Sequence, residues 1–270
     1  MLRDITFGQY YNADSGLHKA DPRSKFVSLI LLIIFLLLCN NIYSLLFAVI
    51  SVIVILLISK VPFNMYLKNL KSILPIIIFT AIINMFYNTE GKVLLSYWKI
   101  TVTTGGIYKS IYMALRIIML IFISSVLTYT TTPNDLTDGI EKLLSPLRIL
   151  GLQNAVHVLV MMMTIALRFI PTLVDETEKI INAQKARGAD IENGKLMERI
   201  KALIPILIPL FITSVRHSYE LAEAMESRCY NGGIGRKRMK QLKYTKNDLF
   251  VFIFTFIICV IIILLNSFLG

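Results

Sequence analysis

Long apolar segments alternate with short polar ones along much of the chain, and their lengths predict membrane-spanning helices. The first segment, 26–58, would extend about 50 Å as a helix, too long for one crossing of a hydrocarbon core about 30 Å thick. Asn40 and Asn41 interrupt this segment, so we expect two short spans joined by a turn. The five predicted spans are 26–39, 42–58, 73–87, 106–129 and 249–268.

The segment 131–248 differs because apolar patches at 156–170 and 203–212 alternate with charged stretches. Neither patch alone has the length of about 20 residues that a crossing requires. The patches form either two additional short crossings or the core helices of a cytoplasmic domain that lies against the membrane. We favour the second interpretation, because it leaves the charged stretches in the cytosol.

The predicted fold class is therefore an all-α integral membrane protein. It has about five transmembrane helices and a helical cytoplasmic domain that contains two long helices. The predicted division is 1–130 for the N-terminal transmembrane helices, 131–248 for the cytoplasmic or membrane-facing domain, and 249–270 for the C-terminal transmembrane helix.

Composition and charge agree with a membrane location. Hydrophobic residues make up 56% of the chain, charged residues only 17%, and the mean hydropathy is +0.68. The net charge of +11 includes Arg23, Lys25 and Lys60 on one side of the first helical hairpin, and the positive-inside rule assigns that side to the cytoplasm. Nucleic-acid binding is disfavoured because the basic residues are not set among exposed aromatic ones.

Motifs for catalysis, metal binding and ion coupling are absent. The segment 232–237 has glycines and a lysine, but not at phosphate-loop spacing, and the five predicted spans contain no carboxylate for an ion relay. Cys39, Cys229 and Cys259 show no disulfide or zinc spacing. In the predicted span 106–129 we expect Arg116 to be satisfied by carbonyl groups or another helix. A membrane enzyme or a channel with a basic cytoplasmic domain remains the alternative function.

Two short arginine motifs are the most informative polar features. The first is Ala186-Arg187-Gly188. We expect its helix to begin after Pro171, where Thr172 and Asp175 have capping-box spacing, and to end at Gly188 in the left-handed cap conformation. The arginine then projects from the C-terminus of the helix.

The second motif is Ser227-Arg228-Cys229, followed by a predicted helix stop at Asn231-Gly232. Here Arg228 continues an apolar stripe formed by Leu221, Ala224 and Met225, which is an unusual place for a charge without a partner. Each arginine could instead complement the dipole of its own helix. The presence of two similar ends favours docking to a partner.

In these segments the sequence resembles the transmembrane T component of energy-coupling factor (ECF) transporters, the vitamin and metal importers of prokaryotes. The resemblance rests on residues 166–171, residues 175–188 and residues 224–230. It implies a non-catalytic scaffold that couples ATP hydrolysis by two ABC-type ATPases to a small substrate-binding membrane subunit, the S component. ATP and Mg²⁺ would bind to the partner ATPases, and this chain would bind no cofactor or metal.

The resemblance also implies roles for particular residues. The ATPase-docking residues would be Ala186, Arg187, Gly188, Ser227, Arg228 and Cys229. The second motif keeps the arginine but replaces both flanking residues with other small ones. We expect possible pivots at Pro171, Pro205 and Pro209, and contact of the basic run 236–246 with anionic lipid headgroups. The expected location is the cell membrane of a prokaryote, with a cytoplasmic coupling domain, a lipid bilayer as partner and no nucleic acid.

Overall fold

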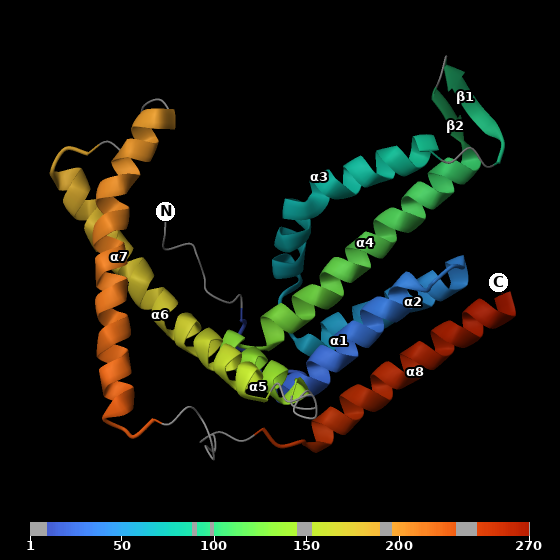
Figure 1. Cartoon of the computed structure of the whole chain (residues 1–270). Coiled ribbons are helices and arrows are strands. Elements are labelled where there is room, and N and C mark those ends of the chain that lie inside the picture. Colours follow the sequence, from blue (N-terminus) through green and yellow to red (C-terminus); the bar gives the residue numbers. More distant parts are fainter. Residues whose placement is uncertain are drawn as a thin grey trace. The chain divides into compact units, whose positions relative to one another are not determined.

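The computed structural model describes residues 10–87, 91–97, 100–144, 153–189, 196–230 and 242–269 (Figure 1). These residues form eight helices and one antiparallel β-hairpin. The elements are α1 (Pro22–Leu37), α2 (Ile42–Ser59), α3 (Phe63–Tyr87), β1 (Val93–Tyr97), β2 (Ile100–Thr103), α4 (Thr104–Thr130), α5 (Pro133–Leu143), α6 (Gln153–Ala186), α7 (Leu196–Glu226) and α8 (Lys246–Leu269). The all-α class is confirmed, with the hairpin as a small addition between α3 and α4.

The chain divides into two compact units. We call residues 8–139 and 242–270 the membrane unit, and residues 1–7 and 140–241 the helix-pair unit. The membrane unit contains α1 to α4 and α8, and the helix-pair unit contains α6 and α7.

Four of the five predicted spans fall on helices of the membrane unit that are long and apolar enough to cross a membrane, α2, α3, α4 and α8. The predicted span 26–39 falls on α1, which has 16 residues and is not among these helices. α1 starts where Asp21 caps it, because the Asp21 side chain accepts the Arg23 N–H and Pro22 occupies the first position. Residues from α1, α2, α3, α4 and α8 form the apolar core. Tyr66 is fully buried there, with its ring edge-on to Tyr129 at 5.2 Å between centroids.

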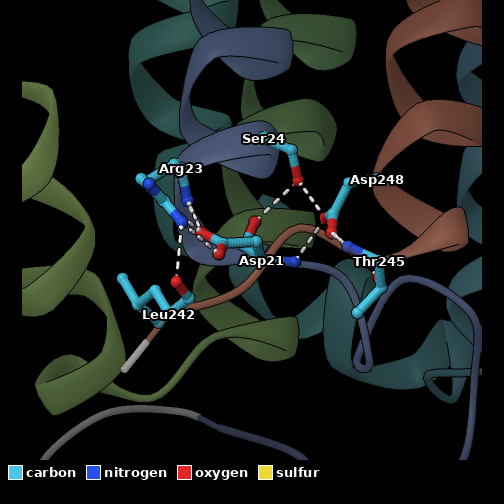
Figure 2. Close-up of polar contacts among 6 residues, drawn as sticks. All are labelled: Asp21, Arg23, Ser24, Leu242, Thr245 and Asp248. Carbon is cyan, nitrogen blue, oxygen red and sulfur yellow. Dashed lines mark hydrogen bonds and ion pairs between the residues drawn. The ribbon is translucent and has the colours of Figure 1, made fainter. Parts of the chain in front are cut away.

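A cluster of polar side chains joins the start of α1 to the start of α8 (Figure 2). We call Asp21, Arg23, Ser24, Thr245 and Asp248 the terminal clamp. One carboxylate oxygen of Asp248 accepts the Asp21 N–H at 2.5 Å and the Ser24 hydroxyl at 2.6 Å. The other accepts the Thr245 N–H at 2.6 Å and its hydroxyl at 2.8 Å. The clamp therefore connects residues more than 220 positions apart in the sequence.

At the opposite end of the membrane unit, the turn between α1 and α2 is also held by polar contacts. Asn266 of α8 donates its amide N–H to the Leu38 carbonyl at 2.7 Å. Arg116 and Tyr112 of α4 both donate to the Cys39 carbonyl. The expected carbonyl contact of Arg116 is present at one Nη, whereas its buried Nε has no hydrogen-bond partner among the described residues.

By length and composition, six helices in the described part of the chain can cross a membrane: α2, α3, α4, α6, α7 and α8. The premise that the patches at 156–170 and 203–212 are too short for a crossing is wrong. Both patches belong to long helices that continue through their prolines, α6 through Pro171 and α7 through Pro205 and Pro209. The predicted helix start at Thr172 is wrong for the same reason. A proline removes one helical hydrogen bond, whereas ending the helix would leave several backbone groups unpaired.

Candidate docking site

α6 and α7 form the body of the helix-pair unit and lie antiparallel. Side-chain contacts between them follow this order: Met161 Sδ with Tyr230 Oη at 2.9 Å, Glu176 Oε1 with His217 Nε2 at 2.7 Å, and Gln184 Nε2 with the Pro205 carbonyl at 3.4 Å. Rising residue numbers on α6 thus meet falling numbers on α7. The C-terminal ends of the two helices, which carry the arginine motifs, consequently point in opposite directions.

The first arginine motif closes α6 in a Schellman turn. Gly188 has φ of 87°, in the left-handed region. Its N–H donates to the Lys185 carbonyl at 3.0 Å, and the Ala189 N–H donates to the Gln184 carbonyl at 3.0 Å. Arg187 is the capping residue of this turn. The predicted left-handed cap at Gly188 is present in the structure.

The second motif closes α7 in the same kind of turn. Cys229 has φ of 55°, and its N–H donates to the Glu226 carbonyl at 2.8 Å. The Tyr230 N–H donates to the Met225 carbonyl at 3.1 Å. Arg228 is the capping residue. The prediction that this helix continues to Asn231 is wrong, because a cysteine takes the left-handed position that usually requires glycine or asparagine.

The two motifs therefore match position by position. In each, a small residue ends the last turn, an arginine caps the helix and the next residue is left-handed: Ala186, Arg187 and Gly188 on α6, and Ser227, Arg228 and Cys229 on α7. The residue pattern predicts Arg228 on an apolar helical stripe. The structure places it just beyond the helix, in the position that Arg187 has on α6.

Both arginines are exposed, as are the four small residues beside them. Within the described residues, neither Arg187 nor Arg228 has an ion-pair partner. A cation at a helix C-terminus is favoured by the partial negative charge of the helix dipole. Each guanidinium group therefore stands exposed at a helix end, where its planar set of donors suits a carboxylate of a partner.

The antiparallel pairing separates the two motifs. Gln184, three residues before Arg187, contacts Pro205, and Arg228 lies 23 residues further along the chain. At 1.5 Å per helical residue, this corresponds to roughly 35 Å. One small ligand cannot contact both arginines, whereas two partner surfaces can.

A polar contact links the first motif to the two prolines of α7. Pro209 has no N–H, so the Pro205 carbonyl lacks its usual helical donor. The Gln184 side chain of α6 lies 3.4 Å from this carbonyl oxygen, and the Gln184 carbonyl also accepts the Ala189 N–H of the first motif. No sequence pattern assigns this role to Gln184. The four-residue spacing of the two prolines is the signal that could have revealed a carbonyl in need of a donor.

Comparison with known proteins shows the family of this chain. Residues 13–242 match the protein family described as CbiQ, cobalt transport protein. The chain is 50% identical over 251 residues to the energy-coupling factor transporter transmembrane protein EcfT of Ruminiclostridium cellulolyticum, covering 93% of each chain. The chain belongs to this family of ECF transporter transmembrane proteins.

Other family members cover the chain equally well. The EcfT protein of Clostridium kluyveri is 49% identical over 249 residues, or 92% of each chain. That of Bacillus subtilis is 38% identical over 267 residues, or 99% of this chain and all of its own. Family membership makes the chain a membrane-embedded component of an ECF transporter complex, and it points to a non-catalytic subunit.

Proposed function

We propose that the chain is the transmembrane scaffold of an ECF-type importer, and that it couples ATP hydrolysis by two ABC-type ATPases to an S component. The observation that carries the proposal is the pair of matching, exposed, arginine-capped helix ends. Two copies of one motif suit two similar partners. The proposal includes a cytoplasmic location for these ends in the cell membrane of a prokaryote, and vitamins or transition-metal ions as the transported substrates.

In this proposal each arginine enters an acidic groove on one ATPase. A guanidinium forms two parallel hydrogen bonds with a carboxylate, and a pair buried at an interface contributes far more than an exposed one. The small residues around Arg187 and Arg228 leave room for the ATPase backbone to approach. ATP and Mg²⁺ bind to the ATPases, while this chain supplies neither a nucleotide site nor a metal site.

Coupling would follow from the geometry of the pair. When ATP draws the ATPases together, the two docked helix ends must change their separation, so α6 and α7 would move relative to each other. Pro171, Pro205 and Pro209 are the proposed pivots, because the backbone bonding of a helix is incomplete at a proline. The long apolar surfaces of α6 and α7 would pass the motion to the S component and the surrounding bilayer.

The test is affinity purification of the tagged full-length chain from solubilised membranes, followed by mass spectrometry of its partners. We expect the wild-type chain to bring down two ATPases and a small membrane subunit. The Arg187→Ala, Arg228→Ala double variant should lose the ATPases, because truncating a buried interfacial arginine costs about 2–4 kcal/mol.

Arg216→Ala is the matched control, since Arg216 is an exposed arginine in the middle of α7. It should retain all partners. Normal ATPase recovery with the double variant would refute the docking proposal. A wild-type chain that is purified alone would favour the alternative, a membrane enzyme or channel.

A further inference from the structure

A cavity of about 120 Å³ lies within the membrane unit, among α1, α2, α4 and α8. Its walls are largely apolar and include Leu29, Leu32, Ile55, Val126 and Phe254. The cavity extends from the first turn of α1 to a position seven residues further along, which is roughly 10 Å. Its volume is below that of a ~150 Å³ cavity that binds benzene, although it is elongated. A long and narrow apolar cavity suits a stretch of alkyl chain better than a ring.

One end of the cavity is polar and lies beside the terminal clamp. Lys25 from the first turn of α1, Thr130 from the end of α4 and Asn247 from the start of α8 line this end. Gly16 and Phe250 also line the cavity, and both are exposed. The cavity is therefore open to a molecule that approaches along the side of α8.

A hydroxyl group inside the cavity has no partner. Ser28 is only 5% exposed, and its Oγ makes no hydrogen bond in the described structure. By contrast, the buried serines of α2 all donate to carbonyls: Ser44 at 2.7 Å, Ser51 at 2.9 Å and Ser59 at 2.6 Å. A buried polar group without a partner is costly, so Ser28 is free to bind a ligand atom.

Lys25 is a buried cation on the same side of α1 as Ser28. It is 7% exposed, and its ammonium donates to the Thr130 carbonyl at 2.9 Å and the His18 carbonyl at 3.3 Å. A third contact, to Thr131 Oγ1, is long at 3.5 Å. Among the described residues no carboxylate lies within 4 Å of it. A buried charge is stabilised by an opposite charge, which an acidic ligand would supply.

We propose that this cavity binds an alkyl chain of an acidic lipid, with the acidic group near Lys25 and Ser28. A free phosphate ion would leave the apolar walls uncovered. With a neutral chain, Lys25 would be balanced only by the carboxylates of Asp135, Asp248 and Asp21, none of which lies within 4 Å of its ammonium group. The acidic group would stand at the end of the unit that carries Arg23, Lys25 and Lys60. Two sources share this chemistry, a fatty acid and an anionic phospholipid.

The test is native mass spectrometry of the full-length chain, purified with any partners that remain bound, in a mild detergent. The probes are oleate, dioleoyl phosphatidylglycerol, dioleoyl phosphatidylcholine and inorganic phosphate. We expect one oleate or one phosphatidylglycerol per chain to bind at least tenfold more tightly than phosphatidylcholine. Preference for oleate would identify a fatty acid as the ligand, and preference for phosphatidylglycerol would identify a phospholipid.

Two variants locate the site. Lys25→Met removes the charge, Ser28→Leu fills the cavity, and each should weaken binding about tenfold. Lys71→Met is the matched control, because it makes the same substitution at an exposed lysine of α3. Equal binding of phosphatidylcholine, binding of phosphate alone, or equal effects of Lys25→Met and Lys71→Met would overturn the proposal.

A measurement on the unmodified protein covers the case in which a variant fails to fold. A fatty acid with a diazirine group in its chain is photolysed on the wild-type protein, and the labelled peptides are mapped. Labels within 28–32 or 250–255 support the cavity. Labels confined to other segments contradict it.

Discussion

The residue that most distinguishes the two arginine motifs is the one after each arginine. Gly188 adopts φ of 87° and Cys229 adopts φ of 55°. Glycine has no Cβ and takes this conformation readily, whereas an L-residue such as cysteine is strained there by about 1–2 kcal/mol. The second motif therefore keeps the turn despite its sequence, and several backbone hydrogen bonds offset the strain.

Cys229→Gly should stabilise the end of α7 by about 1 kcal/mol, because the strain is removed while glycine restores some freedom to the unfolded chain. Gly188→Ala should destabilise the end of α6 by a similar amount. A Cβ at Gly188 meets no atom within 4 Å, so that cost is conformational alone. Hydrogen exchange at the Ala189 and Tyr230 amides measures both effects. Faster exchange of Tyr230 in Cys229→Gly would contradict the strain argument.

At the scale of an element, the informative feature is a helix that continues through two prolines. α7 includes Pro205 and Pro209, yet it runs from Leu196 to Glu226. In a regular helix the N–H of residue 209 would donate to the carbonyl of residue 205, but Pro209 has no N–H. The Gln184 side chain of α6 contacts this Pro205 carbonyl instead. The weak point of α7 is thus in contact with the helix that carries the first motif.

Pro209→Ala should restore the N–H that the Pro205 carbonyl lacks and stabilise α7 by about 1–3 kcal/mol. If the prolines are pivots, the variant should assemble with its partners normally but transport substrate more slowly. Substrate uptake into proteoliposomes measures transport, and hydrogen exchange across 205–213 measures helix stability. A more stable α7 with unchanged uptake would rule out Pro209 as a pivot.

At the scale of the whole membrane unit, the terminal clamp joins α1 to α8, the first and last helices that the structure describes. The Asp248 carboxylate accepts four hydrogen bonds, two from α1 and its cap and two from Thr245. It is 1% exposed, and Asp21 and Ser24 beside it are also buried. Loss of this carboxylate would leave the buried Asp21 N–H without its acceptor and remove the contacts that tie Ser24 and Thr245 to α8.

Asp248→Ala should destabilise the folded chain by about 3 kcal/mol, and Asp248→Asn by less, since an amide oxygen still accepts some of the bonds. Asp14→Ala serves as the control, because Asp14 is 94% exposed and its ion pair with Lys19 contributes little. Thermal unfolding in detergent, with all variants at equal concentration, measures the differences. Equal midpoints for Asp248→Ala and Asp14→Ala would show that the clamp does not stabilise the fold.

Much of the fold could be predicted from the sequence, because membrane crossing depends on local properties. A continuous apolar segment of sufficient length satisfies its backbone only as a helix in lipid, so 42–58 and 249–268 correspond closely to α2 and α8. The first arginine motif was equally predictable, since a glycine after a charged helix end specifies a left-handed cap. These features depend on residues close together in the sequence.

Other features required the tertiary structure. The Asp21 N–H meets the Asp248 carboxylate, Arg116 meets the Cys39 carbonyl and Gln184 meets the Pro205 carbonyl, and each pair is well separated in the sequence. The continuity of α6 through Pro171 and the left-handed turn at Cys229 contradict local preference. A proline inside a helix or a left-handed cysteine costs about 1–3 kcal/mol of stability. The backbone hydrogen bonds of a continuous helix or a closed turn can outweigh this cost. The sequence by itself therefore determined where α2, α8 and the first motif lie, and only the packed chain decided the bounds of α6 and α7 and how the two motifs correspond.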